Sequence, residues 1–201
     1  MDFSDIYQRL KFEEYEISED ERLQLTDYLR SRGSVSRPES HAAMLVFCYS
    51  SESTLENVNL VRKFLAEDTD DYARSAAVNG LYRIWRLGTA SDVNDLLSLL
   101  ALWSVESRHD TSVAAIGCAF HLMHQRNDRL LSTGLMSLLE TLHEEVRREN
   151  EFAVNLFIYA CWSAQDRWAQ SNGHRRVHFD AIEEALPVYW DRSKYLLESI
   201  N

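Results

Sequence analysis

Residues 60–81, LVRKFLAEDTDDYARSAAVNGL, decide the fold class of this chain. An apolar segment, a turn rich in acids and a second segment with apolar and small residues three and four positions apart follow one another here. Such spacings are the period of an α-helix, and small residues on the stripe let a neighbouring helix approach closely. The stretch therefore predicts two antiparallel helices joined by a short turn.

Related segments recur along the chain. Ala76–Asn79 has a counterpart at Ala114–Gly117, and another after the same interval at Phe152–Asn155. A second series, out of phase with the first, relates Val58–Leu65 to Val93–Leu100 after a similar interval. Two interleaved series that share nearly one period predict a repeat of two helices, and the interval is in the range typical of helical-repeat proteins.

The whole sequence predicts an all-α fold, an α-α superhelix of stacked helical hairpins. Only 6 Gly and 2 Pro interrupt it, which disfavours a loop-rich or β fold. Ser18–Glu21 has the pattern of a capping box, and Asp70 or Asp71 can cap a helix that ends at Gly88. We expect one domain over 1–201 with an N-terminal cap helix at 3–15, helix pairs at 18–51, 53–88, 91–126 and 128–165, and a C-terminal cap helix at 179–199.

The segment from Asp71 to Leu81 resembles the second helix of a HEAT repeat. It follows an Asp-rich turn and carries the pattern x-Arg-x-x-Ala-Ala-x-x-x-Leu. The resemblance implies stacked helical hairpins with a concave face, and it implies that Arg74 braces the turns of neighbouring repeats. Later repeats depart from the pattern, with Ser112 or Val113 near the arginine position, so only one repeat matches it well.

The chain is strongly acidic, with 32 Asp and Glu against 21 Lys and Arg and a net charge of −11. Such a surface repels phosphate backbones and anionic membranes and attracts basic partners. Acids gather in the cluster Glu67, Asp68, Asp70 and Asp71, and in the N-terminal segment 1–27, which holds nine acids against three bases. Helix capping, dipole stabilisation and solubility explain the same acids, so both interpretations stay open.

The three cysteines indicate a reducing compartment. Cys48, Cys118 and Cys161 lie singly inside apolar helical stretches and form no closely spaced pair, which predicts buried free thiols. The N-terminal stretch MDFSDIYQRLKFEE lacks the apolar core of a signal peptide. We therefore expect a cytoplasmic protein with no membrane partner.

No sequence motif points to catalysis. The chain lacks the glycine-rich phosphate loops, the zinc-peptidase helix, the C-x-x-C pair and the nucleophile elbow. His121 with His124, and His174 with His178, have the spacing of two ligands on one helix face, but no third ligand is placed beside either pair. We expect a protein that is not an enzyme and that needs no cofactor or metal.

Aligning the repeats so that Ala76 coincides with Ala114 superimposes residues off the apolar stripe of the second helices. We call these sets the ladder positions, and they are Asn79 with Gly117 and Asn155, Arg83 with His121 and Tyr159, and Arg86 with His124 and Trp162. Arg, Tyr and Trp are enriched at interface hot spots. Together with the acidic cluster they predict a partner-binding surface. The alternative is that Trp162 packs under the C-terminal helix and that the other ladder residues are only solvated.

These features favour a protein-binding module with a basic protein partner and a monomeric free state. In size, charge and helical-repeat style the chain resembles acidic all-helical immunity proteins of bacterial contact-dependent inhibition systems. The resemblance implies neutralisation of a nuclease toxin by occlusion of its active site. The alternatives are a HEAT-like alkylpurine DNA glycosylase, which the net charge disfavours because nucleic-acid binding needs a basic surface, and a generic scaffold subunit.

Overall fold

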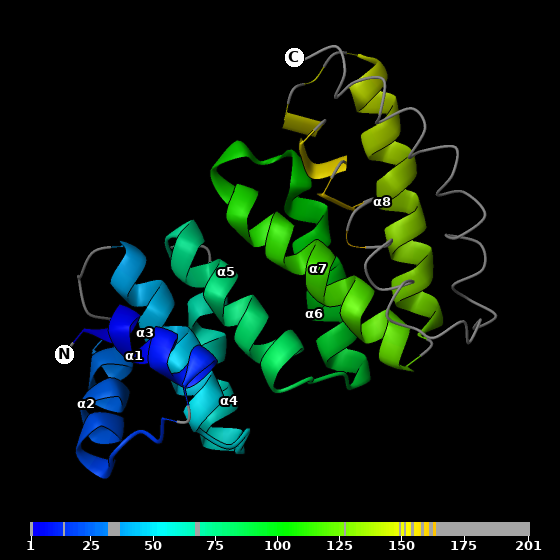
Figure 1. Cartoon of the computed structure of the whole chain (residues 1–201). Helices are drawn as coiled ribbons and strands as arrows, with labels where there is room; N and C mark the ends of the chain where they lie inside the picture. Colours follow the sequence, from blue (N-terminus) through cyan, green and yellow to red (C-terminus); the bar gives the residue numbers. More distant parts are fainter. Residues whose placement is uncertain are drawn as a thin grey trace. The chain divides into compact units, whose positions relative to one another are not determined.

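The structure is a computed structural model (Figure 1). It describes residues 2–13, 15–31, 37–66, 69–126, 128–148 and 150, followed by 152–153, 155–157, 159–160 and 163. Every regular element within these ranges is helical. The described part of the chain is therefore all-α, as the sequence predicts.

The chain divides into two compact units, Met1–Leu87 and Gly88–Asn201. The N-terminal unit contains α1 (Phe3–Phe12), α2 (Glu19–Arg30), α3 (Arg37–Ser50), α4 (Leu55–Arg62) and α5 (Asp71–Asn79). A 3-10 turn, η1 (Lys63–Leu65), extends α4, and a π-helical turn, η2 (Gly80–Ile84), extends α5.

Helix α3 forms the centre of the N-terminal unit. It packs against α1, α2, α5 and η2, and Ala42–Cys48 is buried without a break. A helix that is apolar on all sides requires neighbours on all sides. This apolar run in the sequence thus becomes the core of the unit.

Small residues on α5 allow it to lie close to α3. Ala73, Ala76 and Ala77 are at most 2% exposed, and Leu81 is fully buried, as the stripe predicts. At Gly80 an added Cβ would collide with the Sγ atom of Cys48. Glycine is therefore required there by the close approach of η2 to α3.

Several helix caps follow the sequence pattern. Ser18 and Glu21 form the predicted reciprocal capping box at α2, and Thr54 caps α4 through the Asn57 amide. Thr89 caps the next helix, two residues before the predicted start of that helix pair at residue 91, because its box partner Asp92 lies at the right spacing. Such caps satisfy backbone amides that a helix start leaves unpaired.

The helix formed by α5 and η2 ends earlier than the sequence predicts. Arg86, not Gly88, takes the left-handed conformation at its end, with φ of 56°. The Trp85 amide donates to the Gly80 carbonyl at 2.9 Å, a π-type bond, and the Leu87 amide donates to the Leu81 carbonyl at 3.0 Å. The π-helical turn widens the helix end and brings residue 86 to the left-handed position.

Trp85 ties this helix end to α3. Its indole Nε1–H donates to the carbonyl of Cys48 at 2.9 Å and to that of Ser51 at 3.0 Å. Carbonyls at the end of a helix have no partner within it. The indole N–H supplies a hydrogen-bond donor to the carbonyls at the end of α3. This contact joins distant parts of the chain, so no local sequence pattern predicts it.

The C-terminal unit contains α6 (Ala90–Leu100), the 3-10 turns η3 (Ala101–Ser104) and η4 (Glu106–Arg108), α7 (His109–Arg126) and α8 (Arg129–Arg147). Helices α6, α7 and α8 pack against one another, and Figure 1 shows α8 in yellow-green beside α7. Their facing sides bury Leu96, Leu135 and Leu139. Further helical residues occur between 152 and 163, and the expected cap helix at 179–199 lies outside the described residues.

Two of the three cysteines are described. Cys48 and Cys118 are buried and form no disulfide, as the sequence predicts, and Cys161 lies outside the described residues. Burial raises the pKa of the Cys48 thiol far above its usual value, because a thiolate is poorly solvated in an apolar core. Cys48 therefore behaves as a small apolar residue.

Candidate functional site

The acidic cluster at the start of α5 is only partly described. The Asp70 carboxylate accepts hydrogen bonds from the amides of Tyr72 at 3.1 Å and Ala73 at 3.0 Å. Asp70 therefore caps α5, which is the structural interpretation of this cluster. Asp70 and Asp71 both lie at the first turn of the helix, and Glu67 and Asp68 lie outside the described residues.

Three ladder positions belong to the N-terminal unit. Arg83 is exposed on η2, and Arg86 lies just after it. Asn79 is half-buried, and its side-chain amide donates to the Ser75 carbonyl at 3.1 Å. Arg83 is thus available at the surface, whereas Asn79 is engaged with its own helix.

The other ladder positions belong to the C-terminal unit. Asn155 is exposed, and His121 is half-buried with its Nε2 3.0 Å from Nε2 of Gln125. The half-buried Tyr159 reaches Gly117, where its hydroxyl would lie 2.8 Å from an added Cβ. Tyr159 therefore contacts a residue one turn before its predicted neighbour His121, in keeping with helical side chains that lean toward the N-terminus.

Two further ladder residues are Trp162 and His124. Trp162 and the side chain of His124 lie outside the described residues. Arg83 and Arg86 belong to one unit and His121 and Tyr159 to the other. A continuous ladder across the repeats stays a prediction.

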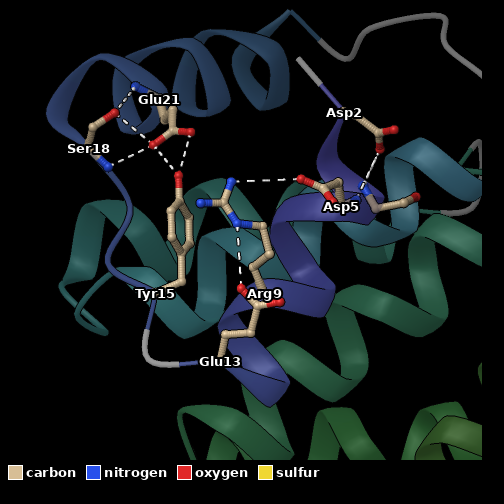
Figure 2. A network of polar contacts seen from close by, with 8 residues as sticks. Asp2, Asp5, Arg9, Glu13, Tyr15, Ser18 and Glu21 are labelled. Atoms are coloured by element: carbon tan, nitrogen blue, oxygen red, sulfur yellow. Dashed lines mark hydrogen bonds and ion pairs between the residues drawn. The ribbon is translucent and has the colours of Figure 1, made fainter.

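A polar network in the N-terminal unit lay outside the predicted site (Figure 2). Its centre is Arg9 on α1, whose guanidinium carbon lies 3.7 Å from the ring centroid of Tyr15. Arg9 Nη1 is 3.8 Å from Asp5 Oδ2, and its Nε is 3.9 Å from Glu13 Oε2. An arginine is thereby held on an aromatic face with a carboxylate on either side.

The second half of this network joins the α1–α2 connection to the start of α2. The Tyr15 hydroxyl donates to both carboxylate oxygens of Glu21, at 2.7 and 2.8 Å, as Figure 2 shows. The amide and hydroxyl of Ser18 also donate to Glu21 Oε2, at 2.8 and 2.7 Å. These bonds, chiefly that from Tyr15, hold the pKa of Glu21 below its usual value, and the same bond raises the pKa of Tyr15.

The arginines of segment 1–27 are engaged, while many of its acids face solvent. Arg9 pairs with Asp5 and Glu13, and Arg22 lies 3.8 Å from Glu19. The side chains of Asp5, Glu13 and Glu19 are nevertheless 63%, 66% and 74% exposed. Exposed ion pairs of this kind are weak, so these carboxylates remain accessible to a cation from outside.

Beside this network lies a second feature, the aromatic cluster, defined here as Tyr7, Lys11, Phe12 and Tyr49. The rings of Tyr7 on α1 and Tyr49 on α3 are 6.2 Å apart between centroids. The Lys11 ammonium lies 5.7 Å from the Tyr7 centroid and 5.1 Å from that of Phe12. Phe12 is 71% and Tyr49 54% exposed, so large aromatic side chains face solvent here.

Sequence reasoning missed this cluster. The spacing of Tyr7 and Lys11, four positions apart, was a signal for one helix face. Tyr49 is distant from Tyr7 in the chain and belongs to another helix. Only the packing of α1 on α3 brings the two rings together.

The described residues contain no group of three or more His, Cys, Asp or Glu side chains placed to hold a metal. Within the same ranges, no helix is both long enough and apolar enough to cross a bilayer. The chain has no significant match among protein-family models, curated proteins or solved structures.

Proposed function

We propose that this protein is a binding module that holds a basic protein partner through an acidic, aromatic surface. The observation that supports it most is the state of the charges in segment 1–27. It holds nine acids against three bases, and the side chains of Asp5 and Glu19 stay 63% and 74% exposed although each lies near an arginine. The local field is therefore one that attracts a cationic partner.

The physical benefit of such a surface is speed and selectivity. Exposed like charges raise the local concentration of an oppositely charged partner and accelerate association, and the effect falls with added salt. With 32 acids against 21 bases, the whole chain contributes to the attraction. The same field repels nucleic acids and anionic membranes.

The specific role that we favour is that of an immunity protein against a nuclease-type toxin. A toxin that cleaves nucleic acid needs Lys and Arg side chains to hold phosphates. An acidic surface can occupy those side chains and cover the active site. The resemblance in size, charge and helical style supports this role.

The architecture that we propose for this role is a HEAT-like superhelix. The series α2–α3, α4–α5 and α6–α7 supplies successive helix pairs. Arg74 near the start of α5 is buried, with a relative exposure of only 7%. Arginine is rarely buried unless it is paired, which supports the bracing role that the HEAT resemblance implies.

The test begins with capture of the partner by the intact chain from its native host, followed by identification. Association rates are then measured at several salt concentrations for a variant with Asp5, Glu19 and Asp20 changed to Lys. A second variant changes Asp68 and Asp71 to Lys and spares the cap Asp70. We expect slower association and weaker salt dependence in at least one variant, by about tenfold in rate at low salt.

A matched control changes exposed polar residues of the same unit without changing charge, for example Gln8→Asn and Gln24→Asn. If a captured partner is acidic, or if both charge reversals leave association unchanged, the proposal is wrong. The immunity role has its own test, which is rescue of growth when the chain is co-expressed with a toxin encoded by a neighbouring gene. Rescue without direct binding to the toxin would contradict active-site occlusion.

A further inference from the structure

The aromatic cluster is the strongest unassigned feature of the N-terminal unit. Exposed aromatic side chains at a soluble surface are unusual when several lie together. Here the exposed Phe12 and Tyr49 and the half-buried Tyr7 come from two helices and are linked by ring–ring and ring–ammonium contacts. The cluster is therefore a surface formed by several side chains in contact and not one isolated exposed residue.

Acidic residues lie near the cluster residues in the chain, beside the positive charges of Lys11 and Arg9. Glu13 follows Phe12 directly in the chain and is 66% exposed. Glu52, also exposed, lies three residues after Tyr49. An aromatic face with a carboxylate near it attracts a cation by two interactions, one with the quadrupole of the ring and one with the negative charge of the carboxylate.

The chain contains an example of this recognition. Arg9 lies on the face of Tyr15 at 3.7 Å and between Asp5 and Glu13. The planar guanidinium is well suited to an aromatic face combined with a carboxylate, and better suited than an ammonium. In the aromatic cluster the corresponding position is filled by the ammonium of Lys11.

We propose that the aromatic cluster is the docking surface for an arginine-rich segment of the partner, and that Lys11 is an internal cation which that segment displaces. This inference rests on the proposed function and deepens it by naming the surface and the chemistry of the segment. Guanidinium groups stack on Tyr7, Phe12 and Tyr49 and pair with Glu13 and Glu52. Displaced Lys11 turns into solvent.

The probe is a peptide of nine arginines, compared with one of nine lysines, titrated into the intact chain at low salt. Binding is followed by calorimetry and by amide chemical shifts in NMR spectra. We expect the arginine peptide to bind several-fold more tightly, with the largest shifts at residues 7, 11, 12 and 49.

Two variants remove the rings and the internal cation. Changing both Phe12 and Tyr49 to Ala is expected to weaken binding of the arginine peptide about fivefold to tenfold, because two exposed cation–π contacts are lost. Lys11→Met is expected to strengthen it, and by more than Lys63→Met, which makes the same change of charge at another lysine of the unit.

Controls separate the rings from general effects. Tyr49→Phe keeps the aromatic face and is expected to bind like the unaltered chain. Leu55→Ala removes a side chain that is 76% exposed on α4, and it should leave binding unchanged. Circular dichroism confirms that the double Ala variant is folded.

Three outcomes overturn the inference. The arginine peptide could bind with chemical-shift changes at other residues and with equal affinity for the double Ala variant. In that case the docking surface is wrong while the proposed function stands. If neither cationic peptide binds at low salt, the proposed function fails as well. If the double Ala variant loses binding to neutral lipid vesicles but retains peptide binding, the cluster is a lipid surface instead.

Discussion

Glu21 combines two tasks in one carboxylate. It completes the capping box of α2 by accepting a hydrogen bond from the Ser18 amide. It also accepts a hydrogen bond from the hydroxyl of Tyr15 in the preceding loop. The first task is encoded by a spacing of three residues, which is visible in the sequence. The second fixes the loop between α1 and α2, and it places Tyr15 where Arg9 can lie on its ring.

The lowered pKa of Glu21 predicts a pH-dependent contribution to stability. A carboxyl whose pKa is lower in the folded than in the unfolded chain stabilises the fold above its unfolded pKa, near 4.5. Glu21→Gln keeps the capping pattern but removes the charge. We expect it to lower the free energy of unfolding by about 0.5 kcal/mol at pH 7, a small value because solvent screens this site.

That difference should disappear as the pH falls below about 4.5 and through the folded pKa of Glu21. Urea unfolding of both proteins between pH 3 and 7 measures it. Glu19→Gln, on the same helical turn, serves as a control for loss of a surface charge. Parallel curves for wild type and Glu21→Gln over the whole range would contradict the assignment.

At the scale of the element, the helix of α5 and η2 shows how tertiary contacts adjust a local pattern. Its apolar stripe makes it a helix, and the bonds from Trp85 attach the end of this helix to the end of α3. Arg86 then takes a conformation with φ of 56°, which non-glycine residues rarely adopt. π-helical turns occur often at functional sites, and this one presents Arg83 to solvent.

Arg86 offers a direct test of this helix end. Arg86→Gly and Arg86→Ala both remove the side chain, but only glycine accepts a positive φ without strain. We expect Arg86→Gly to be more stable than Arg86→Ala by about 1 kcal/mol. Thermal unfolding compares the two, and equal stabilities would show that residue 86 does not need a left-handed backbone.

Gly80 tests the contact between η2 and α3. Gly80→Ala introduces a Cβ that collides with Cys48, and we expect a loss of about 1–3 kcal/mol in the free energy of unfolding. Adding Cys48→Ala removes the colliding sulfur, so the double variant should recover part of the loss. Chemical denaturation of the wild type, the two single variants and the double variant gives the coupling free energy between residues 48 and 80. Additive effects would mean that the two residues do not touch.

At the scale of the whole molecule, the dominant property is charge. The net charge of −11 favours a cationic partner whichever surface makes the contact. It also disfavours the glycosylase alternative, because a protein binds nucleic acid by placing basic side chains on the phosphates, which releases the counterions held there. Arg83 and Arg86 form one of several short basic stretches in this acidic chain.

The corresponding prediction concerns nucleic acid. The isolated chain should not shift duplex DNA or single-stranded RNA in a gel at low salt, with a dissociation constant weaker than ~10⁻⁴ M. Tight, salt-dependent binding would instead favour the nucleic-acid enzyme. Loss of that binding in the double variant Arg83→Glu, Arg86→Glu would then place the nucleic-acid site at these two arginines.

The sequence by itself determined the class of the fold and much of its local detail. Helical periodicity and the caps at Ser18 and Asp70 depend on residues within a few positions of one another, so a linear pattern contains them. The same holds for the net charge and for the buried state of Cys48 and Cys118.

The tertiary structure alone decided where side chains from distant segments meet. The early helix end at Arg86, the Tyr159 contact with Gly117 and the pairing of Tyr7 with Tyr49 all depend on contacts that no local spacing relates. The physical reason is packing. A helix presents its faces by local rules, but which residue meets which depends on how closely two helices approach, and that depends on all the side chains between them.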